Sequence, residues 1–188
     1  GYYVLGMGFI LTTDEALALI ARDAKNKDVL FPYLNGEELN SRPDQSSTRW
    51  AINFFDWPIE RAMQYPDCFK IIEEHVKPER QRCDEHGKFV LRKPLPEQWW
   101  IYAEKRPALR REIEGKQRVL LRARIANLHS MTWVPASWVY SEKTVVFPEG
   151  DFVIMQSSIH EAWARSYSTT LRTDMQYTPS DCFETFPF

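Results

Sequence analysis

The sequence predicts an α+β fold in a single domain, with helices mainly in the first half and an antiparallel sheet in the second half. The length of 188 residues suits one globular domain, and 44% hydrophobic residues with 27% charged residues support a sizeable core. Helix-start signals gather before residue 115, whereas short apolar runs between turn residues fill the chain from residue 118 onward. Helices and strands segregated in this way are typical of the α+β class.

The first half begins with the clearest helix signal in the chain. Thr12 precedes an apolar-periodic run and Glu15 follows three residues later, which is the pattern of a capping box and predicts a helix over residues 13–24. Asn35-Gly36 predicts a turn that leads into a polar loop over 37–47. Strand composition occurs over 28–34, 50–55 and 99–102, and a proline at the start predicts helices over 58–64, 66–76 and 107–114.

In the second half, apolar runs alternate with turn residues. They predict five short strands, over residues 118–125, 129–134, 137–140, 144–147 and 151–157. A helix over 157–166 and an extended segment over 183–188 complete the expected order of elements.

The charge of the chain is distributed unevenly along the sequence. The formal net charge is −2, but residues 76–124 contain 14 basic and 7 acidic side chains, whereas the segments on both sides are acidic. A basic segment between acidic ones indicates a surface that contacts nucleic-acid phosphates. The alternative is an ordinary solvated helix face.

Motifs for cofactor binding and methyl transfer are absent from the sequence. Gly6-Met7-Gly8 follows an apolar stretch, but Leu11 stands where a G-x-G-x-x-G loop needs its third glycine, so a tight turn is expected there. The sequence has no Pro-Pro, and therefore no N-P-P-Y/F tetrapeptide to hold a flipped adenine. We expect no catalysis and no cofactor in this chain.

Two sets of residues have the composition of metal sites without the usual pattern. Asp67 with Glu114 and Lys116 has the composition of a metal-dependent nuclease site, although Asp67 and Glu114 also suit helix ends. Zinc-ligand residue types occur close together without the usual paired spacing, at Cys68, His75, Cys83 and His86. We expect no metal site in either set.

Two features indicate the cellular location. No run of about 18 apolar residues occurs, so the sequence predicts no membrane span. Three irregularly spaced cysteines favour a reducing cytoplasm over a disulfide framework.

The chain begins with Gly1 rather than Met, and we expect it to be part of a longer polypeptide.

Seven short stretches form an ordered set of motifs along the chain. They are Gly6-Met7-Gly8-Phe9, Pro32-Tyr33-Leu34-Asn35-Gly36, Trp50-Ala51-Ile52-Asn53-Phe54, Val76-Lys77-Pro78-Glu79-Arg80, Trp99-Trp100, Ser158-Ile159-His160-Glu161-Ala162-Trp163, and the end from Tyr177 to Phe188. This set resembles the target-recognition domain of the MmeI-like type IIG restriction-modification enzymes, which are N6-adenine DNA methyltransferases. Asn53 departs from that family's Asp, and Gln176 departs from its usual Arg.

The resemblance implies that residues 1–188 are a DNA target-recognition domain. In that family the domain follows an S-adenosylmethionine-dependent methyltransferase domain, which itself follows an endonuclease domain. The implied partners are double-stranded DNA and the upstream methyltransferase domain of the same polypeptide. The aromatic residues of the motifs are expected in the core: Phe54, Trp99, Trp100, Trp163, Phe186 and Phe188.

Polar and basic residues between the motifs are the candidates for DNA contact. Arg122 and Arg124 are two apart on a predicted strand, so we expect both to project from one sheet face towards base edges. The other candidates are Lys77, Arg80, Arg82, Asn127, His129, Ser130, Ser141, Lys143, Arg165, Thr170 and Arg172. The alternative hypothesis is a protein-interaction module of a phage-defence methyltransferase complex.

Overall fold

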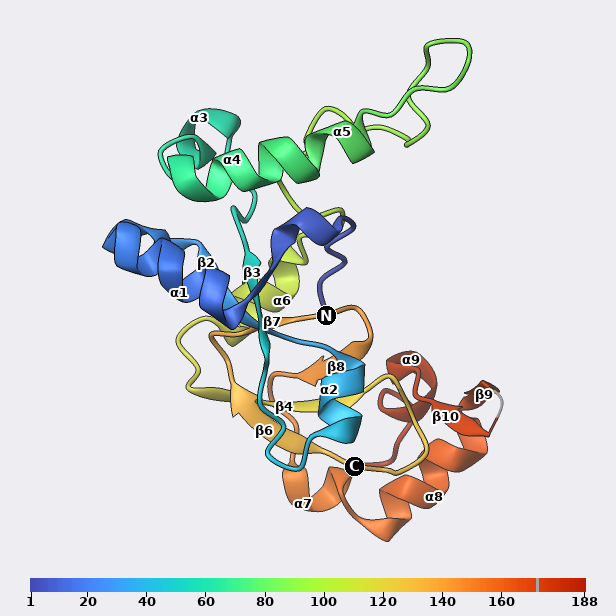
Figure 1. The fold of residues 1–188 in the computed structure, drawn as a ribbon. Helices are drawn as coiled ribbons and strands as arrows, with labels where there is room; N and C mark the ends of the chain where they lie inside the picture. Colours follow the sequence, from blue (N-terminus) through green and yellow to red (C-terminus); the bar gives the residue numbers. More distant parts are fainter. Residues whose placement is uncertain (172) are drawn as a thin grey trace. The chain divides into compact units, whose positions relative to one another are not determined.

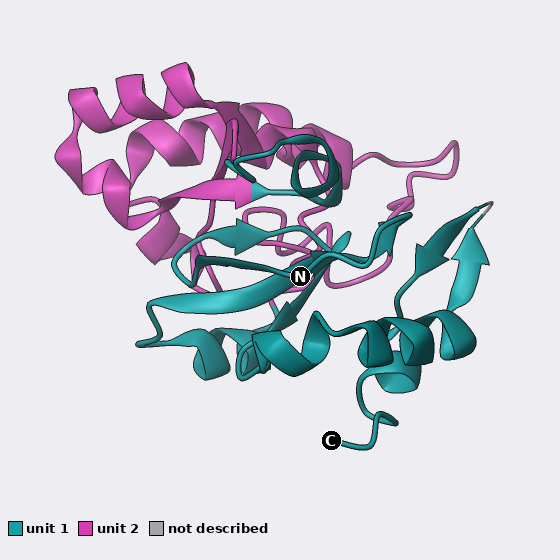
Figure 2. Cartoon of the chain, turned by 90° about the horizontal axis from the view of Figure 1, so that it is seen from below, with its two compact units in different colours: residues 1, 34–46, 106–188 teal, residues 2–33, 47–105 magenta. Residues whose placement is uncertain are grey.

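The computed structural model describes residues 1–171 and 173–188, and it contains the helices and antiparallel strands of the predicted α+β class (Figure 1). The described chain divides into two compact units, each assembled from separate stretches (Figure 2). Unit 1 consists of Gly1, residues 34–46 and residues 106–188. Unit 2 consists of residues 2–33 and 47–105. The basic segment over 76–124 is therefore shared between the two units.

Unit 2 contains antiparallel strands that pair around β3 (Arg49–Ile52). This strand pairs with β1 (Ile10–Thr12), placing Ala51 opposite Ile10, and with β2 (Leu30–Leu34), placing Ile52 opposite Leu30. Helix α1 (Thr13–Arg22) follows β1 directly. The predicted capping box is confirmed, because Thr12 Oγ1 accepts from Glu15 N at 3.2 Å and Thr12 N donates to the Glu15 carboxylate at 2.8 Å.

The helical part of unit 2 is organised around aromatic residues. It contains α3 (Ile59–Ala62), α4 (Pro66–His75) and α5 (Lys77–Arg80), and short 3-10 turns η1 (Met7–Phe9) and η2 (Ala24–Asp28) precede them in the chain. The fully buried Phe54 ring lies 6.3 Å from the Phe69 ring, which lies 5.4 Å from that of Trp99. The expected strand over 99–102 is wrong, because these residues lie in turns and bends; Tyr102 is buried, and its hydroxyl is satisfied by donating to the Ile52 carbonyl.

Unit 1 is built on a three-stranded antiparallel sheet with β4 (Arg118–Ala123) in the centre. β4 pairs with β6 (Thr132–Pro135) on one side and with β8 (Thr144–Phe147) on the other. Val119 and Leu121 belong to one apolar cluster and Leu120 belongs to another, so both faces of β4 are covered. This double burial decides where the side chain of Arg122 lies.

The remaining elements of unit 1 cover this sheet or extend from it. They are α2 (Gly36–Ser41), α6 (Pro107–Ile113), β5 (Ile125–Ala126), β7 (Val139–Tyr140), α7 (Phe152–Met155), α8 (Ser158–Tyr167), β9 (Thr169–Leu171), β10 (Asp174–Gln176) and α9 (Pro179–Cys182). Leu39 of α2 joins the first cluster, whereas Met155, Ala164 and Cys182 of α7, α8 and α9 join the second. A second sheet has the strand order β5-β10-β9.

Three expectations for unit 1 are wrong. The polar loop over 37–47 begins as helix α2, because Asn35 and Glu38 form a capping box. The strand over 151–157 is helix α7, whose first turn is capped by the Asp151 carboxylate accepting from Ile154 N at 3.1 Å. The expected extended segment over 183–188 begins with turn residues at 183–185, and Phe188 is 64% exposed instead of buried.

Candidate nucleic-acid interface

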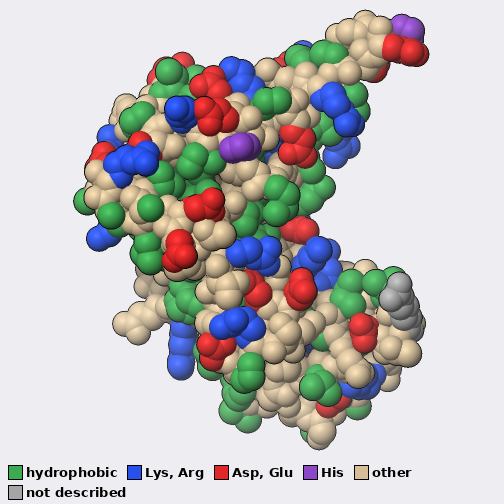
Figure 3. Space-filling model, in the orientation of Figure 1, with side chains coloured by type: hydrophobic (Ala, Val, Ile, Leu, Met, Phe, Trp, Pro, Cys, Tyr) green, Lys and Arg blue, Asp and Glu red, His purple; other side chains and the backbone are tan. Residues whose placement is uncertain are grey.

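The candidate contact residues are divided between the two units. Lys77, Arg80 and Arg82 lie in unit 2. Most of the others lie in unit 1, at Arg122, Arg124, Asn127, His129, Ser130, Ser141, Lys143, Arg165 and Thr170. Arg172 lies outside the described residues. On the face shown in Figure 3, Lys and Arg side chains are interspersed with Asp and Glu rather than gathered in one patch.

Arg80 is a structural residue of unit 2 rather than a surface cation. It is 1% exposed, and its guanidinium donates to the carbonyls of Val4 at 2.8 Å, Leu5 at 2.8 Å and Ile101 at 2.7 Å. Burial lowers the pKa of Arg80 to about 10. The prediction that Arg80 contacts phosphate is wrong for this conformation, because its donors are occupied and shielded from solvent. It joins segments that are far apart in the sequence.

The two neighbouring basic candidates of unit 2 are accessible. The Lys77 ammonium lies 2.8 Å from the Glu73 carboxylate and 5.0 Å from the centre of the Trp99 ring. Arg82 is exposed. Of the three basic candidates in this unit, Lys77 and Arg82 are therefore accessible to a phosphate.

Arg122 points into the core of unit 1. It is fully buried, its carbon Cζ lies 4.2 Å from the centre of the Tyr177 ring, and its Nη1 lies 3.0 Å from His129 Nδ1. Arg122 Nη2 has no hydrogen-bond partner among the described residues. The prediction that Arg122 and Arg124 project together to solvent is wrong, because the face of β4 that carries Arg122 packs against a second apolar cluster.

His129 connects this buried arginine to the next loop. Its Nε2 lies 2.7 Å from the carbonyl oxygen of Met155, which only accepts, so Nε2 carries the hydrogen. Nδ1 is then free to accept from Arg122. Burial, and next the charge of Arg122, lower the pKa of His129, which agrees with a neutral ring. His129 is 6% exposed, so the expected direct base contact by its ring is also wrong.

A second histidine lies behind the first. The ring centres of His129 and His160 are 5.4 Å apart, and His160 Nε2 lies 3.0 Å from the Tyr177 hydroxyl. Burial, followed by the nearby His129 and Arg122, lowers the pKa of His160 to about 4. Both rings therefore remain neutral in the folded unit at pH values where free histidine gains a proton.

These shifts predict a loss of stability in mild acid. In the unfolded chain both histidines titrate near 6.5, so the unfolded state binds more protons than the folded state as the pH falls from 6.5 to about 4. The free energy of unfolding, measured by chemical denaturation at a series of pH values, should fall across this window. His160→Gln should flatten the fall, whereas His86→Gln, at an exposed position, should preserve it. If the free energy of unfolding of the wild type stays constant across this window, burial does not hold the two histidines in the neutral form.

The loop that follows β5, residues 127–131, is held at both ends by side chains. Gln156 donates from Nε2 to the His129 carbonyl at 2.8 Å and accepts from Met131 N at 2.7 Å through Oε1. Arg165 donates to the Asn127 carbonyl at 3.1 Å while its guanidinium pairs with Glu161. We call this segment the 127–131 loop. Its backbone is fixed, and the side chains of Asn127 and Ser130 remain exposed.

The 127–131 loop forms one wall of a groove within unit 1. The groove has a volume of about 580 Å³, and we call it the unit 1 groove. Its lining residues come from three parts of the sequence: Leu39, Asn40, Ser41, Arg42, Pro43 and Gln45; Ala126, Asn127, Leu128 and Ser130; and Asp174. The amide of Asn40 joins two of these parts by donating to the Ile125 carbonyl at 3.0 Å.

The remaining candidates of unit 1 differ in accessibility. Ser141 is 1% exposed and supports a turn, because its hydroxyl oxygen accepts from Lys143 N at 3.2 Å, so its expected DNA contact is wrong. Lys143 and Thr170 are exposed, and Arg124 is half-buried. The Lys143 carbonyl would lie 2.8 Å from a Cβ at Gly36, which explains why glycine starts α2.

Sequence reasoning missed five polar residues of the groove: Asn40, Ser41, Arg42, Gln45 and Asp174. A signal was present for the first four, because polar residues continue without interruption after the Asn35-Gly36 motif. Nothing in the spacing linked that run to the 127–131 loop. Asp174 lies on β10, one strand of a short hairpin with β9 that was not predicted.

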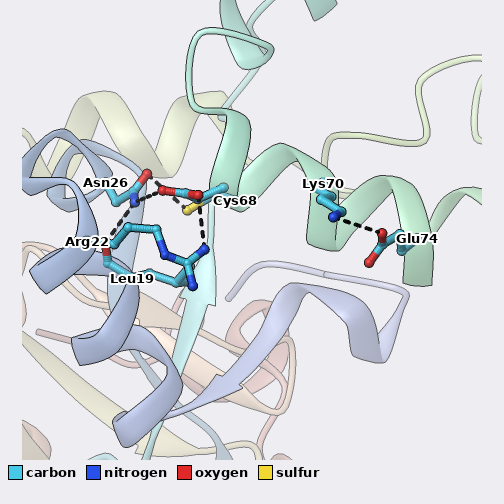
Figure 4. A network of polar contacts seen from close by, with 7 residues as sticks. Leu19, Arg22, Asn26, Cys68, Lys70 and Glu74 are labelled. Atoms are coloured by element: carbon cyan, nitrogen blue, oxygen red, sulfur yellow. Dashed lines mark hydrogen bonds and ion pairs between the residues drawn. The ribbon is translucent and has the colours of Figure 1, made fainter.

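Three residues of the two alternative metal sites, Asp67, Cys68 and Lys116, have structural partners. Asp67 accepts from Arg22 Nη1 at 3.2 Å and from Asn26 Nδ2 at 3.0 Å, and this network also includes the thiol of Cys68 (Figure 4). Lys116 pairs with Glu149 at 3.2 Å. Over residues 1–171 and 173–188, no group of three or more His, Cys, Asp or Glu side chains is arranged to hold a metal ion.

No helix within these ranges is both long and apolar enough to cross a membrane.

One comparison with known proteins identifies a family, and another identifies a solved structure of similar fold. A family model described as "MmeI, target recognition domain" matches residues 3–188. The solved structure of the type IIL restriction-modification enzyme MmeI in complex with DNA is similar over 100% of this chain, with a TM-score of 0.75 and 17% sequence identity. The chain corresponds to 24% of the length of that protein. No curated protein matches the sequence.

Proposed function

The chain belongs to the MmeI target recognition domain family, and from this membership we propose that it selects the DNA sequence on which a type II restriction-modification enzyme acts. The observation that carries the proposal within this chain is the unit 1 groove. Polar side chains from three separate segments converge there, and the backbone of the 127–131 loop is tied by Gln156 and Arg165. A surface that discriminates between bases needs side chains held in this way.

The accessible cations suit contacts with phosphates rather than with bases. Lys143 in unit 1 and Arg82 in unit 2 are exposed, and the Lys77 ammonium is accessible beside Glu73. Phosphate contacts fix the register of a protein on DNA, whereas contacts in the grooves read the sequence. Arg124, Arg165 and Thr170 are further candidates in unit 1. Arg165 also has a structural role, because its guanidinium donates a hydrogen bond to the Asn127 carbonyl.

The catalytic steps are assigned to other parts of the polypeptide. We expect an upstream N6-adenine methyltransferase domain, with S-adenosylmethionine as its cofactor, and an endonuclease domain before it. The sequence of this chain has no N-P-P-Y/F tetrapeptide that would hold a flipped adenine. The methyltransferase domain would then be the protein partner of this chain, and the cytoplasm would be its compartment.

Salt dependence of DNA binding tests this function. At physiological salt the purified chain should bind duplex DNA with a dissociation constant of about 10⁻⁴ to 10⁻⁶ M, because lysine and arginine contacts release counterions from DNA. Fluorescence anisotropy over a range of salt concentrations should give a steep linear dependence of log affinity on log salt. Lys143→Ala should reduce the slope by about 0.9, whereas Ser166→Ala should leave it unchanged.

A second candidate function, a protein-interaction module of a phage-defence methyltransferase complex, is favoured by one surface. The short helix α7 exposes three consecutive apolar side chains, Phe152 at 37%, Val153 at 78% and Ile154 at 37%. Such a patch is typical of protein contacts. The salt titration separates the two functions, because a chain that binds only protein would show no affinity for duplex DNA even at low salt.

A further inference from the structure

We propose that the unit 1 groove reads one adenine·thymine base pair from the major-groove side, with Asn127 bonding the adenine and Leu128 contacting the thymine methyl group. This inference rests on the proposed function and names the chemistry of its reading surface. It assigns the groove to base edges and not to phosphates.

One wall of the groove is made of polar side chains that are already bonded within unit 1. The Asn40 amide donates to the Ile125 carbonyl, and the Ser41 hydroxyl donates to the Glu37 carbonyl at 2.8 Å. The Gln45 amide oxygen accepts from the Thr132 hydroxyl. These side chains therefore build the groove. They keep the α2 segment close to β5 and β6.

Other side chains of the groove are available to a ligand. Among the described residues, none forms a hydrogen bond to the side chains of Asn127, Ser130 or Asp174. Asn127 and Ser130 are exposed, and Leu128 is 73% exposed between them. The backbone beneath them is fixed at the Asn127 carbonyl, the His129 carbonyl and the Met131 amide. Because this backbone is already ordered, binding restricts only the rotamers of the side chains.

The charge of the groove argues against a phosphate ligand. Among the described lining residues the cation is Arg42, which has its Nε 3.0 Å from the Ser46 hydroxyl oxygen and 3.4 Å from the Asp44 carboxylate. Asp174 adds a carboxylate to the lining. A carboxylate repels phosphate, but it accepts hydrogen bonds from the amino groups of adenine or cytosine. The ligand that fits is therefore the edge of a base pair.

The free side chains favour adenine·thymine over guanine·cytosine. An asparagine amide presents one donor and one acceptor to adenine N7 and N6, and an exposed leucine is complementary to the thymine methyl group. Guanine presents two acceptors, N7 and O6, which match only the donor of the asparagine amide, and its cytosine partner offers Asp174 an amino group but has no methyl group. Only an adenine·thymine pair offers both the donor–acceptor pattern and the methyl group.

Selection from a library of randomised duplexes tests the proposal. The 188-residue chain should enrich a motif with at least one invariant adenine·thymine position. Asn127→Ala should relax that position by about 10-fold and leave the others unchanged, because one bidentate base contact is lost. Lys143→Ala is the matched control and should weaken binding to all sequences alike. The thermal unfolding temperature of each variant should equal that of the wild type, since these side chains are exposed.

A thymine-to-deoxyuridine substitution in the selected duplex isolates the methyl contact. Removing the methyl group should weaken binding by the wild-type chain several-fold and should have no effect on Leu128→Ala. If a motif is enriched but Asn127→Ala and Leu128→Ala leave every base preference intact, the groove does not read this pair, although sequence recognition stands. If the wild type binds DNA without enriching any motif, the proposed function itself is wrong.

Discussion

Replacing Arg80 with methionine is expected to lower the free energy of unfolding by roughly 3 kcal/mol or more, because three buried carbonyls of unit 2 lose a charged donor. Methionine approximately conserves the length and apolar volume of the side chain, so the loss reports hydrogen bonding rather than a cavity. Chemical denaturation measures the change. Arg80 would then be needed for the fold of unit 2, not for holding DNA.

Arg82→Met is the matched control for this prediction. Arg82 is two residues further along the chain and is exposed, so the substitution should change stability by no more than about 0.5 kcal/mol. The expected pattern is a large effect at Arg80 with little at Arg82. Equal stabilities of the two variants, with weaker DNA binding only for Arg80→Met, would show instead that Arg80 is a phosphate contact.

His129→Ala should be the most disruptive change in unit 1. It leaves the Met155 carbonyl and Arg122 Nη1 without their partner in the core, while Arg122 Nε keeps its bond to the Ala123 carbonyl, and the loss costs about 2–3 kcal/mol. The 127–131 loop loses its internal anchor at the same time. We therefore expect weaker discrimination between duplex sequences in addition to a lower free energy of unfolding.

Ser130→Ala separates these two effects. The Ser130 side chain is exposed in the groove next to His129, so its loss should leave stability within about 0.5 kcal/mol of the wild type. Base discrimination can change in this variant without a change in stability. If His129→Ala is as stable as Ser130→Ala, the buried His129 ring does not make the hydrogen bonds to Met155 and Arg122 that its tautomer implies.

Short sequence motifs correctly predicted those elements whose ends are set by interactions between residues close together in the sequence. Thr12 and Glu15 specified the start of α1, and the proline at position 66 specified the start of α4. Helix α2 was missed because an Asn-Gly pair suits a tight turn as well as a helix cap, and only the Glu38 carboxylate decides between them. Apolar runs at 99–102 and 151–157 suggested strands, but no strand in the described part of the chain pairs with them, and burial alone does not form strand hydrogen bonds.

The candidate site was predicted less completely than the fold, for a physical reason. The continuous apolar run Val119-Leu120-Leu121 is typical of a strand buried on both faces, and it could have shown that Arg122 points inward. The groove depends on a contact between Asn40 and Ile125, which are 85 positions apart. No periodicity or local motif reports such a contact, because it forms only when the separate stretches of unit 1 pack together.

Hydrogen–deuterium exchange of the chain with and without the selected duplex tests the central claim most directly. The claim is that unit 1 reads DNA through the groove between α2 and the 127–131 loop. We expect slower exchange on DNA binding in residues 40–45 and 127–131, and clearly weaker protection of both segments when Asn127→Ala replaces the wild type at a concentration near the wild-type dissociation constant. Protection confined to residues 77–92 of unit 2, with unchanged exchange around the groove, would contradict it.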